Sequence, residues 1–228
     1  MVVALIPARG GSKRLPRKNL RSFAGRPLIL YSIALAQNIN LIDRCIVSTE
    51  DEEIAAVARS LGAEVVKRPP ALADDFATTA SVARHVLEQI SAEGKVPEAL
   101  LTLQPNCPLR TVSLVQQALE FFFANTADSV ITVTRNHRKL GEIQDRHFIP
   151  KYKPGIRSQD MAPTYFENGL AYVSRASLVL KEGKLFGRKI LALEVDPLYA
   201  LGDIDTELDF QVAEFVFEKY RDHFSYIS

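Results

Sequence analysis

The sequence predicts an α/β protein in which a mostly parallel sheet lies between two layers of helices, with a small arm protruding from this three-layer body. Short apolar runs rich in β-branched residues alternate along the chain with longer segments of helical spacing, as in βαβ units. One polar stretch, residues 136–164, interrupts this alternation and is too long to be an ordinary connection in a compact domain. We therefore expect this stretch to form the arm.

The first half of the chain contains four predicted strands, at residues 2–6, 45–47, 63–66 and 99–103. A helix is predicted over residues 27–37, because Leu28, Tyr31 and Leu35 recur at helical spacing. A second, over residues 51–61, begins with acidic side chains that the helix dipole favours and ends before Gly62. A third is predicted over residues 78–90.

The second half continues the alternation on both sides of the arm. A helix over residues 112–123 leads to a strand over residues 129–133, and after the arm come a strand over residues 170–173 and a helix starting near Ser174. A strand over residues 190–195 and a final helix over residues 206–220 complete the pattern. With no internal repeat, we expect a single domain covering residues 1–228.

Composition restricts the classes of function. The 228 residues are 47% hydrophobic and 24% charged, which is typical of a globular protein with a core. The formal net charge is only +1, so any anionic ligand must be held by a local basic cluster. The two cysteines, Cys45 and Cys107, have no CxxC spacing, which argues against a disulfide framework or a zinc site. We see neither a signal peptide nor a membrane-spanning run, and expect a cytoplasmic protein that binds no membrane.

The loop after the first strand carries the strongest functional signal. It reads Ala-Arg-Gly-Gly-Ser-Lys-Arg-Leu-Pro-Arg-Lys-Asn over residues 8–19, with five cations between positions 9 and 18. Gly10 and Gly11 would let the backbone turn sharply and point N–H groups at an anion. The spacing is neither that of a Walker A loop nor GxGxxG. A triphosphate suits such a loop at the carboxyl end of a strand, whereas a solvated basic turn or an RNA-binding patch is the alternative.

Two aspartates precede the final helix. Asp203 and Asp205 are two residues apart, so in an extended segment both carboxylates point the same way and could reach one Mg²⁺ ion. Asp205 alone could equally be the N-cap of the helix, which would leave Asp203 unexplained. Glu207 and Asp209 fall in the first helical turns and are interpreted as surface charges favoured by the dipole.

A third segment, residues 104–110, follows a predicted central strand. Gln104 and Asn106 offer amide groups suited to sugar hydroxyls or a base edge, and two prolines stiffen the loop. Cys107 has no neighbouring base, so we interpret it as a buried small side chain rather than a nucleophile. Gln104 could also be a plain strand-end residue.

In combination and order, these segments resemble the acylneuraminate cytidylyltransferases, the family of CMP-sialic acid synthetases and their bacterial nonulosonate relatives. The resemblance covers nearly the whole chain. It is carried by residues 6–13, 18–19, 46–49, 68–69, 104–105, 108–110, 168–169 and 203–207. It implies a Rossmann-like nucleotidyltransferase that couples CTP to a nine-carbon sialic-acid-type 2-keto sugar acid, with Mg²⁺ as cofactor, and releases pyrophosphate.

The resemblance also implies roles for individual residues. Lys18, Arg9 and Asp205 would be catalytic, and Asp203 and Asp205 would hold Mg²⁺. The implied nucleotide-binding residues are Ala8, Arg9, Gly10, Gly11, Ser12, Lys13, Lys18, Asn19, Arg68 and Ser81. Gln104, Arg157 and Asn168 would bind the sugar acid. The family is usually dimeric, so residues 136–164 are expected to pack on a partner and to help complete the sugar site. No side chain stands out as a general base.

Three departures from the family pattern lie on the sugar side. Asn106-Cys107 stands where Thr-Ser is usual. Glu50 replaces the aspartate of the usual Ser-Thr-Asp triplet at residues 48–50. Glu167 precedes Asn168-Gly169, where apolar residues or proline are common. These departures leave the sugar open. KDO cytidylyltransferases, which have glycine at the position of Arg17, rank second, followed by other sugar nucleotidyltransferases. A nucleotide- or RNA-binding module without catalysis is the non-enzymatic alternative, and the acidic pair argues against nucleic acid as a partner.

Overall fold

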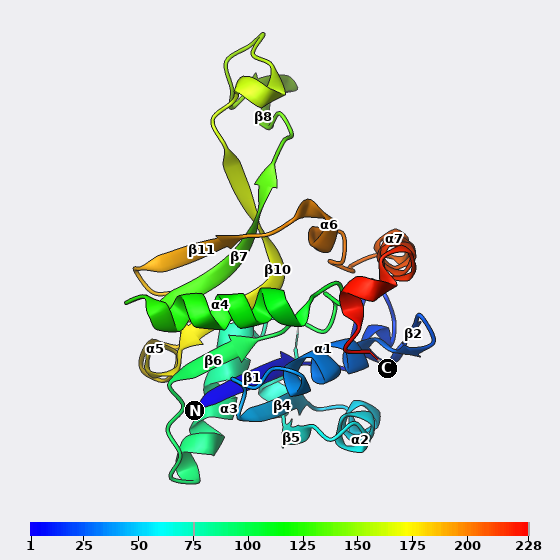
Figure 1. Cartoon of the computed structure of the whole chain (residues 1–228), viewed down its shortest axis with the longest axis vertical. Coiled ribbons are helices and arrows are strands. Elements are labelled where there is room, and N and C mark those ends of the chain that lie inside the picture. The colour runs from blue at the N-terminus through cyan, green and yellow to red at the C-terminus, as the bar shows by residue number, and fades with distance from the viewer. Residues whose placement is uncertain (75, 228) are drawn as a thin grey trace.

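The computed structural model describes residues 1–74 and 76–227, and a seven-stranded sheet forms its centre (Figure 1). The order across the sheet is β11-β7-β10-β6-β1-β4-β5. The bounds of these strands are β1 Val2–Pro7, β4 Arg44–Thr49, β5 Glu64–Lys67, β6 Ala99–Thr102, β7 Ser129–Asn136, β10 Thr164–Arg175 and β11 Ile190–Glu194. β10 is antiparallel to β6 and β7, and the other neighbouring strands run parallel. The predicted mostly parallel sheet is confirmed.

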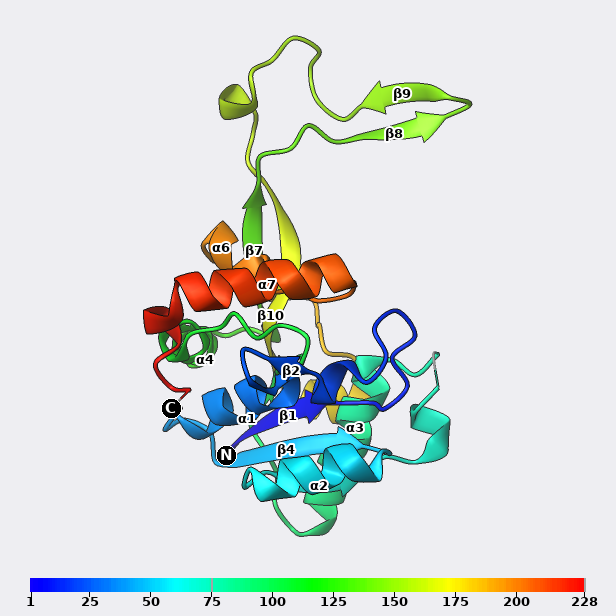
Figure 2. The same cartoon turned by 90° about the vertical axis from the view of Figure 1, so that its right-hand side faces the viewer.

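Helices cover both faces of the sheet (Figure 2). Their bounds are α1 Leu28–Gln37, α2 Glu52–Ser60, α3 Thr79–Ala92, α4 Val112–Ala124, α5 Ala176–Glu182, α6 Pro197–Ala200 and α7 Glu207–Lys219. Short 3₁₀ helices occupy Lys18–Leu20, Pro70–Leu72, Ser158–Asp160 and Arg221–Phe224. No helix in the described ranges has the length and apolarity needed to cross a membrane.

The alternation of side chains along β1 explains the three layers. Ala4 and Ile6 belong to one buried cluster, with residues of α1, α2 and α4, while Val3 and Leu5 belong to another, with residues of α3 and α5. Successive residues of a strand point to opposite faces, so a continuous apolar run buries both. α7 packs outside this body, where its aromatic side chains join Phe23 and Tyr31 of the region around α1.

The arm rises from the sheet as a continuation of two strands (Figure 1). β7 and β10 pair beyond the body as far as Thr164 opposite Asn136, and a bulge interrupts their register between Glu167 and Tyr172. Beyond them, β8 Gly141–Gln144 and β9 His147–Pro150 form a hairpin. Figure 2 shows this hairpin extending sideways from the top of the arm.

The predicted elements all occur, with differences at their ends and around the arm. β10 is a strand of 12 residues where only residues 170–173 were expected, because its first half pairs with β7 outside the body and lacks a buried face. α5 begins at Ala176 rather than near Ser174. The two-residue strands β2 Ser22–Phe23 and β3 Arg26–Pro27 form a small separate sheet. These strands and α6 are too short to give a periodic pattern and were not predicted.

Candidate active site

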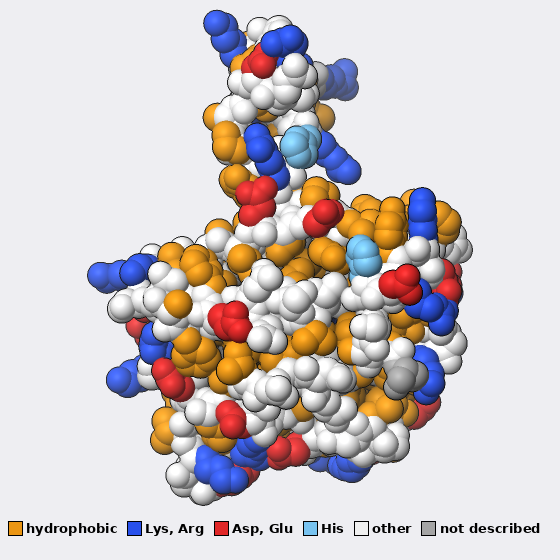
Figure 3. All heavy atoms as spheres, viewed as in Figure 1, with side chains coloured by type: hydrophobic (Ala, Val, Ile, Leu, Met, Phe, Trp, Pro, Cys, Tyr) orange, Lys and Arg blue, Asp and Glu red, His pale blue; other side chains and the backbone are white. Residues whose placement is uncertain are grey.

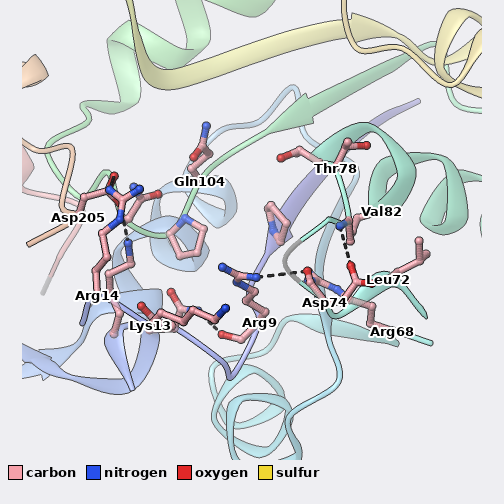
Figure 4. A pocket seen from close by; sticks show the side chains of 18 residues that line it. Arg9, Lys13, Arg14, Arg68, Leu72, Asp74, Thr78, Val82, Gln104 and Asp205 are labelled. Atoms are coloured by element: carbon pink, nitrogen blue, oxygen red, sulfur yellow. Dashed lines mark hydrogen bonds and ion pairs between the residues drawn. The ribbon is translucent and has the colours of Figure 1, made fainter. Parts of the chain in front are cut away.

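A cavity of about 450 Å³ opens at the carboxyl ends of β1 and β6, where ligands bind in open α/β sheets. Its lining comes from the loop after β1, the segment before α3, the loop after β6 and the segment before α7. Figure 4 shows Arg14 and Asp205 on one side of the cavity, Arg68, Leu72 and Val82 on the other, and Gln104 between them. Two segments nearly two hundred residues apart in sequence therefore meet at one site.

Lys18 and Asp205 are in direct contact in this cavity. The Lys18 Nζ donates to the Ile204 carbonyl at 2.7 Å and lies 3.2 Å from Asp205 Oδ1. Arg14 Nη1 donates to Asp205 Oδ2 at 2.8 Å. The cationic loop and the acidic segment thus face each other, as a triphosphate site with a divalent ion requires.

Gly10 serves the loop differently from the prediction. Its N–H donates to Glu50 Oε1 at 2.8 Å, so this group is used inside the protein rather than aimed at a ligand. A Cβ on Gly10 would lie 2.4 Å from Asp51 Oδ2, which is a steric clash, so any residue with a side chain would displace Asp51. Close approach to the first turn of α2, and not a positive φ, is therefore what requires glycine here.

The far end of the loop is held by polar side chains. Asn19 is buried and its Nδ2 donates to the Arg9 carbonyl at 2.9 Å, which ties the two ends of the loop together. Arg17 has a left-handed backbone with φ 57° and pairs with Asp51 and Glu53 of α2. These contacts fix the position of Lys18, which begins the following 3₁₀ helix.

The acidic segment ends in a capping box. Thr206, not Asp205, is the N-cap of α7, and its side chain accepts from the Asp209 N–H while Asp209 accepts from Thr206. Asp209 also accepts from the Asp205 N–H at 3.1 Å. Its carboxylate therefore fixes the backbone of the segment before α7 and is not only a surface charge, as the sequence had suggested. The Asp205 carboxylate does not cap the helix, and it lines the cavity.

Asp203 lies beside this segment and accepts from Asn106 Nδ2 at 2.8 Å. Its pKa is raised, first because the surrounding protein displaces water from the carboxyl and second because of the charge of Asp205. A cation near both carboxylates would oppose both effects.

Arg68 lines the opposite side and is buried, with 5% of its surface exposed. Its Nη2 donates to the Ser48 carbonyl at 2.8 Å, and its Nε lies 3.9 Å from Glu50 Oε2. Burial lowers the pKa of this guanidinium and the charge of Glu50 opposes that change. Glu50 therefore contacts both the loop after β1, through Gly10, and Arg68 on the other side of the cavity.

The loop after β6 presents Gln104 to the cavity and is held from behind by Arg110. The guanidinium of Arg110 is fully buried and donates to the carbonyls of Gln104 and Cys107 and to the Ser32 hydroxyl. Cys107 is buried, and burial raises the pKa of its thiol to about 12, as expected for a packed cysteine rather than a nucleophile.

Gln104 lies beside the bulge of β10. Gly169 there has φ 70°, and a Cβ on it would lie 3.6 Å from Gln104 Nε2 and 3.3 Å from Cys107 Sγ. Buried Asn168 fixes this bulge, since it donates to Thr134 Oγ1 and accepts from Thr132 Oγ1 and the Leu170 N–H. Asn168 thus positions the backbone beside Gln104 and does not itself line the cavity.

A second hollow of about 510 Å³ adjoins the first, and Thr78, Thr79 and Gln104 line both. Its other walls are largely apolar, formed by Ala80, Tyr172, Gly183, Lys184, Leu185 and Phe186. Tyr172 donates to Glu167 Oε2 at 3.5 Å. This hollow offers aromatic surface and hydroxyls beside a polar, cationic cavity.

The structure distributes the residues predicted for the site as follows. Those lining the first cavity are Arg9, Ser12, Lys13, Lys18, Asn19, Arg68, Gln104 and Asp205. Those outside its lining are Ala8, Gly10, Gly11, Ser81, Arg157, Asn168 and Asp203. The Ser81 hydroxyl donates to the Thr78 carbonyl within its own helix turn, and Arg157 pairs with Asp160 in the arm. Their binding roles stay predictions.

Several lining residues have no individual role among those that the family resemblance implies. They are Arg14, Asp74, Thr78, Thr79 and Asn106, and Arg9 donates to the Asp74 carbonyl at 3.3 Å. Arg14 was noted only as one of the five loop cations and Asn106 only for its amide group. Asp74 had no signal, because it lies in an irregular segment before α3 whose position depends on tertiary packing.

The donor set fits Mg²⁺ that is shared with a nucleotide. Asp203 and Asp205 supply two carboxylates, and no cluster of three or more His, Cys, Asp or Glu suited to a metal occurs in residues 1–74 and 76–227. Mg²⁺ is typically held by one or two carboxylates together with substrate phosphates and water, rather than by a cage made only of protein. The cations around the cavity suit those phosphates.

Comparison with known proteins agrees with this geometry. The model of the cytidylyltransferase family matches residues 3–186. The chain belongs to this family. It is therefore a nucleotidyltransferase, which confirms the resemblance found in the sequence.

Individual cytidylyltransferases match over most of the chain. Pseudaminic acid cytidylyltransferase of Campylobacter jejuni is 31% identical over 223 residues, covering 95% of this chain and 96% of that protein. N-acylneuraminate cytidylyltransferase A of Danio rerio is 33% identical over 222 residues, covering 93% of this chain and 50% of that protein.

A solved structure supports the fold. CMP:2-keto-3-deoxy-manno-octonic acid synthetase complexed with CTP superposes with a TM-score of 0.73 at 16% identity, covering 96% of this chain and 98% of that one. This similarity establishes the shared Rossmann-like architecture of the cytidylyltransferase.

Proposed function

We propose that this cytidylyltransferase transfers CMP from CTP to a nine-carbon 2-keto sugar acid of the sialic-acid type and releases pyrophosphate, with pseudaminic acid as the first candidate. The meeting of Lys18 and Asp205 in one cavity that also reaches Arg68 and Gln104 carries this proposal. The similarity to a pseudaminic acid cytidylyltransferase along almost the whole chain supports the choice of sugar.

In the proposed reaction the anomeric hydroxyl of the sugar acid attacks the α-phosphorus of CTP, and pyrophosphate leaves. Lys18 and Arg9 stabilise the negative charge that develops on the transferred phosphate, and they do so from positions already fixed by the loop. Arg68 lies on the base side, and Gln104 orients the acceptor between the two hollows. Bound Mg²⁺ at Asp203 and Asp205 would supply further charge neutralisation and would favour ionisation of the attacking hydroxyl.

The second hollow is the proposed acceptor site. A deoxy, acylated sugar acid combines apolar methyl groups with polar hydroxyl and amide groups, and the hollow combines Tyr172 and Phe186 with Thr78, Thr79 and Gln104. Lys184, which also lines the hollow and pairs with Glu182 at 3.2 Å, offers a cation for the sugar carboxylate.

Pyrophosphate release measured with each combination of nucleotide and sugar acid tests the proposal. CTP, UTP, GTP and ATP are each combined with pseudaminic acid, N-acetylneuraminic acid and KDO. We expect the highest kcat/KM for CTP with pseudaminic acid, and measurable turnover with other nine-carbon acids. Turnover restricted to KDO, or a preference for another nucleotide, would reject the assignment.

We further propose that the enzyme acts as a homodimer joined through the arm. The arm exposes large apolar side chains, including Leu140, Ile143 and Phe148, and Ile143 and Phe148 are opposite each other on the β8–β9 hairpin. Hydrophobic side chains also gather on the body beneath the arm, over α6 and α7 (Figure 3). Apolar surface of this kind marks interaction sites.

Replacing Ile143 by aspartate is therefore expected to convert the dimer to a monomer, because the side chain is 78% exposed in one chain and would carry a charge into the contact. Light scattering during size exclusion should show the mass fall toward the chain mass of 25.4 kDa. Gln144→Asp, on the opposite face of the same strand, is the matched control and should remain dimeric. An unchanged mass for Ile143→Asp would reject the arm as the contact.

A further inference from the structure

Both carboxylate oxygens of Asp205 are held by cations of the loop after β1. Lys18 Nζ lies 3.2 Å from Oδ1, and Arg14 Nη1 lies 2.8 Å from Oδ2. Figure 4 shows Arg14 reaching across the edge of the cavity to this carboxylate. The positions from which Asp205 would bind a divalent ion are therefore occupied by the chain itself.

The two cations differ in how firmly they are held. The Lys18 side chain is 15% exposed and also donates to the Ile204 carbonyl at 2.7 Å. The Arg14 side chain is 71% exposed, and Asp205 is its hydrogen-bond partner among the residues that the structure describes. Arg14 can leave Asp205 at the loss of one exposed ion pair, and such pairs contribute little to stability. Lys18 cannot leave without breaking a half-buried contact as well.

The exposure of the Arg14 side chain permits this movement. Its neighbour Leu15 is buried in the cluster that includes Phe23, which anchors the backbone there. The guanidinium can change position by rotation about the side-chain bonds, because the side chain is largely exposed. Arg14 lines the same cavity as Lys13 and Ser12, so a triphosphate bound there would be within its reach.

We infer that Arg14 occupies the place of the divalent ion on Asp205 in the nucleotide-free enzyme, and that it transfers to the triphosphate when CTP binds. A guanidinium matches phosphate oxygens in a bidentate way, so the triphosphate competes with Asp205 for it. The ion then binds a carboxylate that has just been vacated. This inference rests on the proposed nucleotide and metal site, and it makes binding of the ion and of the nucleotide mutually reinforcing.

Binding of Mn²⁺ to the nucleotide-free protein tests the first half. Free Mn²⁺ is counted by electron paramagnetic resonance during a titration of wild type and of Arg14→Met, a variant that keeps the length and apolar stem of the side chain. We expect Arg14→Met to bind the ion about three- to tenfold more tightly. The guanidinium of Arg14 no longer competes with Mn²⁺ for the Asp205 carboxylate, and its positive charge no longer repels the ion. Unchanged Mn²⁺ affinity would overturn the inference.

Two further variants separate this effect from a general change in charge. Arg17→Met removes the same charge from the same loop, but Arg17 pairs with Asp51 and Glu53, so its gain should be smaller. Adding Asp205→Asn to Arg14→Met should abolish the gain in Mn²⁺ affinity, because the carboxylate that binds the ion is then absent. Equal gains for the two arginine variants, or a gain that survives Asp205→Asn, would contradict the role of Arg14.

Calorimetric titration of CTP in excess chelator tests the second half. Without metal, CTP should bind Arg14→Met several-fold more weakly than it binds wild type, since one phosphate contact is missing. Equal CTP affinities would show that Arg14 does not move to the triphosphate. Neither titration contains a sugar acid or depends on turnover, so both remain decisive even if the proposed sugar is wrong.

Discussion

Lys18→Ala is expected to lower kcat by about 10²- to 10³-fold, because it removes a fixed cation from the place where we propose that charge develops on the transferred phosphate. The effect on folding should be small. Lys18 forms one partly buried ion pair with Asp205 and one hydrogen bond to the Ile204 carbonyl, contacts that together contribute about 1–2 kcal/mol. Steady-state kinetics and urea unfolding on the same preparations measure both losses.

Arg21→Ala is the matched control for this variant. Arg21 lies three residues after Lys18 in the sequence, and its guanidinium forms an ion pair with Glu207 of α7 outside the cavity. We expect Arg21→Ala to lose a similar amount of stability and to keep kcat close to that of wild type. If Lys18→Ala lost activity only in proportion to its stability, Lys18 would be a structural lysine.

Asp205→Ala is expected to reduce turnover with Mg²⁺ by at least about 10³-fold, since it removes one of two carboxylates available to the ion and a charge partner of Lys18. The fold should survive, because Thr206 and not Asp205 caps α7. Pyrophosphate release across a range of Mg²⁺ concentrations, with circular dichroism as a check on folding, measures the change.

Glu207→Gln removes a carboxylate from the same short segment and serves as the comparison. Its side chain contacts Arg21 and Gln211 on the surface, so we expect nearly full activity and an unchanged dependence on Mg²⁺. Near-normal turnover by Asp205→Ala at ordinary Mg²⁺ would refute the metal assignment.

Sequence alone placed the cationic loop at the edge of the sheet, because this loop follows a predicted strand and ligands bind at the carboxyl ends of such strands. The meeting of Lys18 with Asp205 was expected from the family resemblance, since Asp205 precedes a predicted helix and no strand-end rule places it. The β1 strand and α2 were equally accessible, because apolar runs and acidic first turns act locally.

The remaining parts depend on contacts that no local pattern encodes. The link from Gly10 through Glu50 to Arg68 joins three segments, and each residue taken alone has an ordinary interpretation. Arg110 is similar, since a basic residue after Pro-Leu gives no sign that it will be fully buried under a loop. The arm was recognised by its length, but its hairpin could not be predicted because neither face of β8 or β9 is buried in one chain.

The bulge in β10 has a consequence for engineering this enzyme. Strands β7 and β10 both continue from the sheet into the arm, with a bulge in their register, and at this bulge Gly169 leaves only about the room of a Cβ beside Gln104. A chimaera joined near the tip of the arm would exchange only the outer hairpin. One joined below the bulge, between Val133 and Tyr172, would exchange the support behind Gln104 as well. Because we propose that Gln104 orients the acceptor, this second junction is the better route for transplanting acceptor preference between relatives.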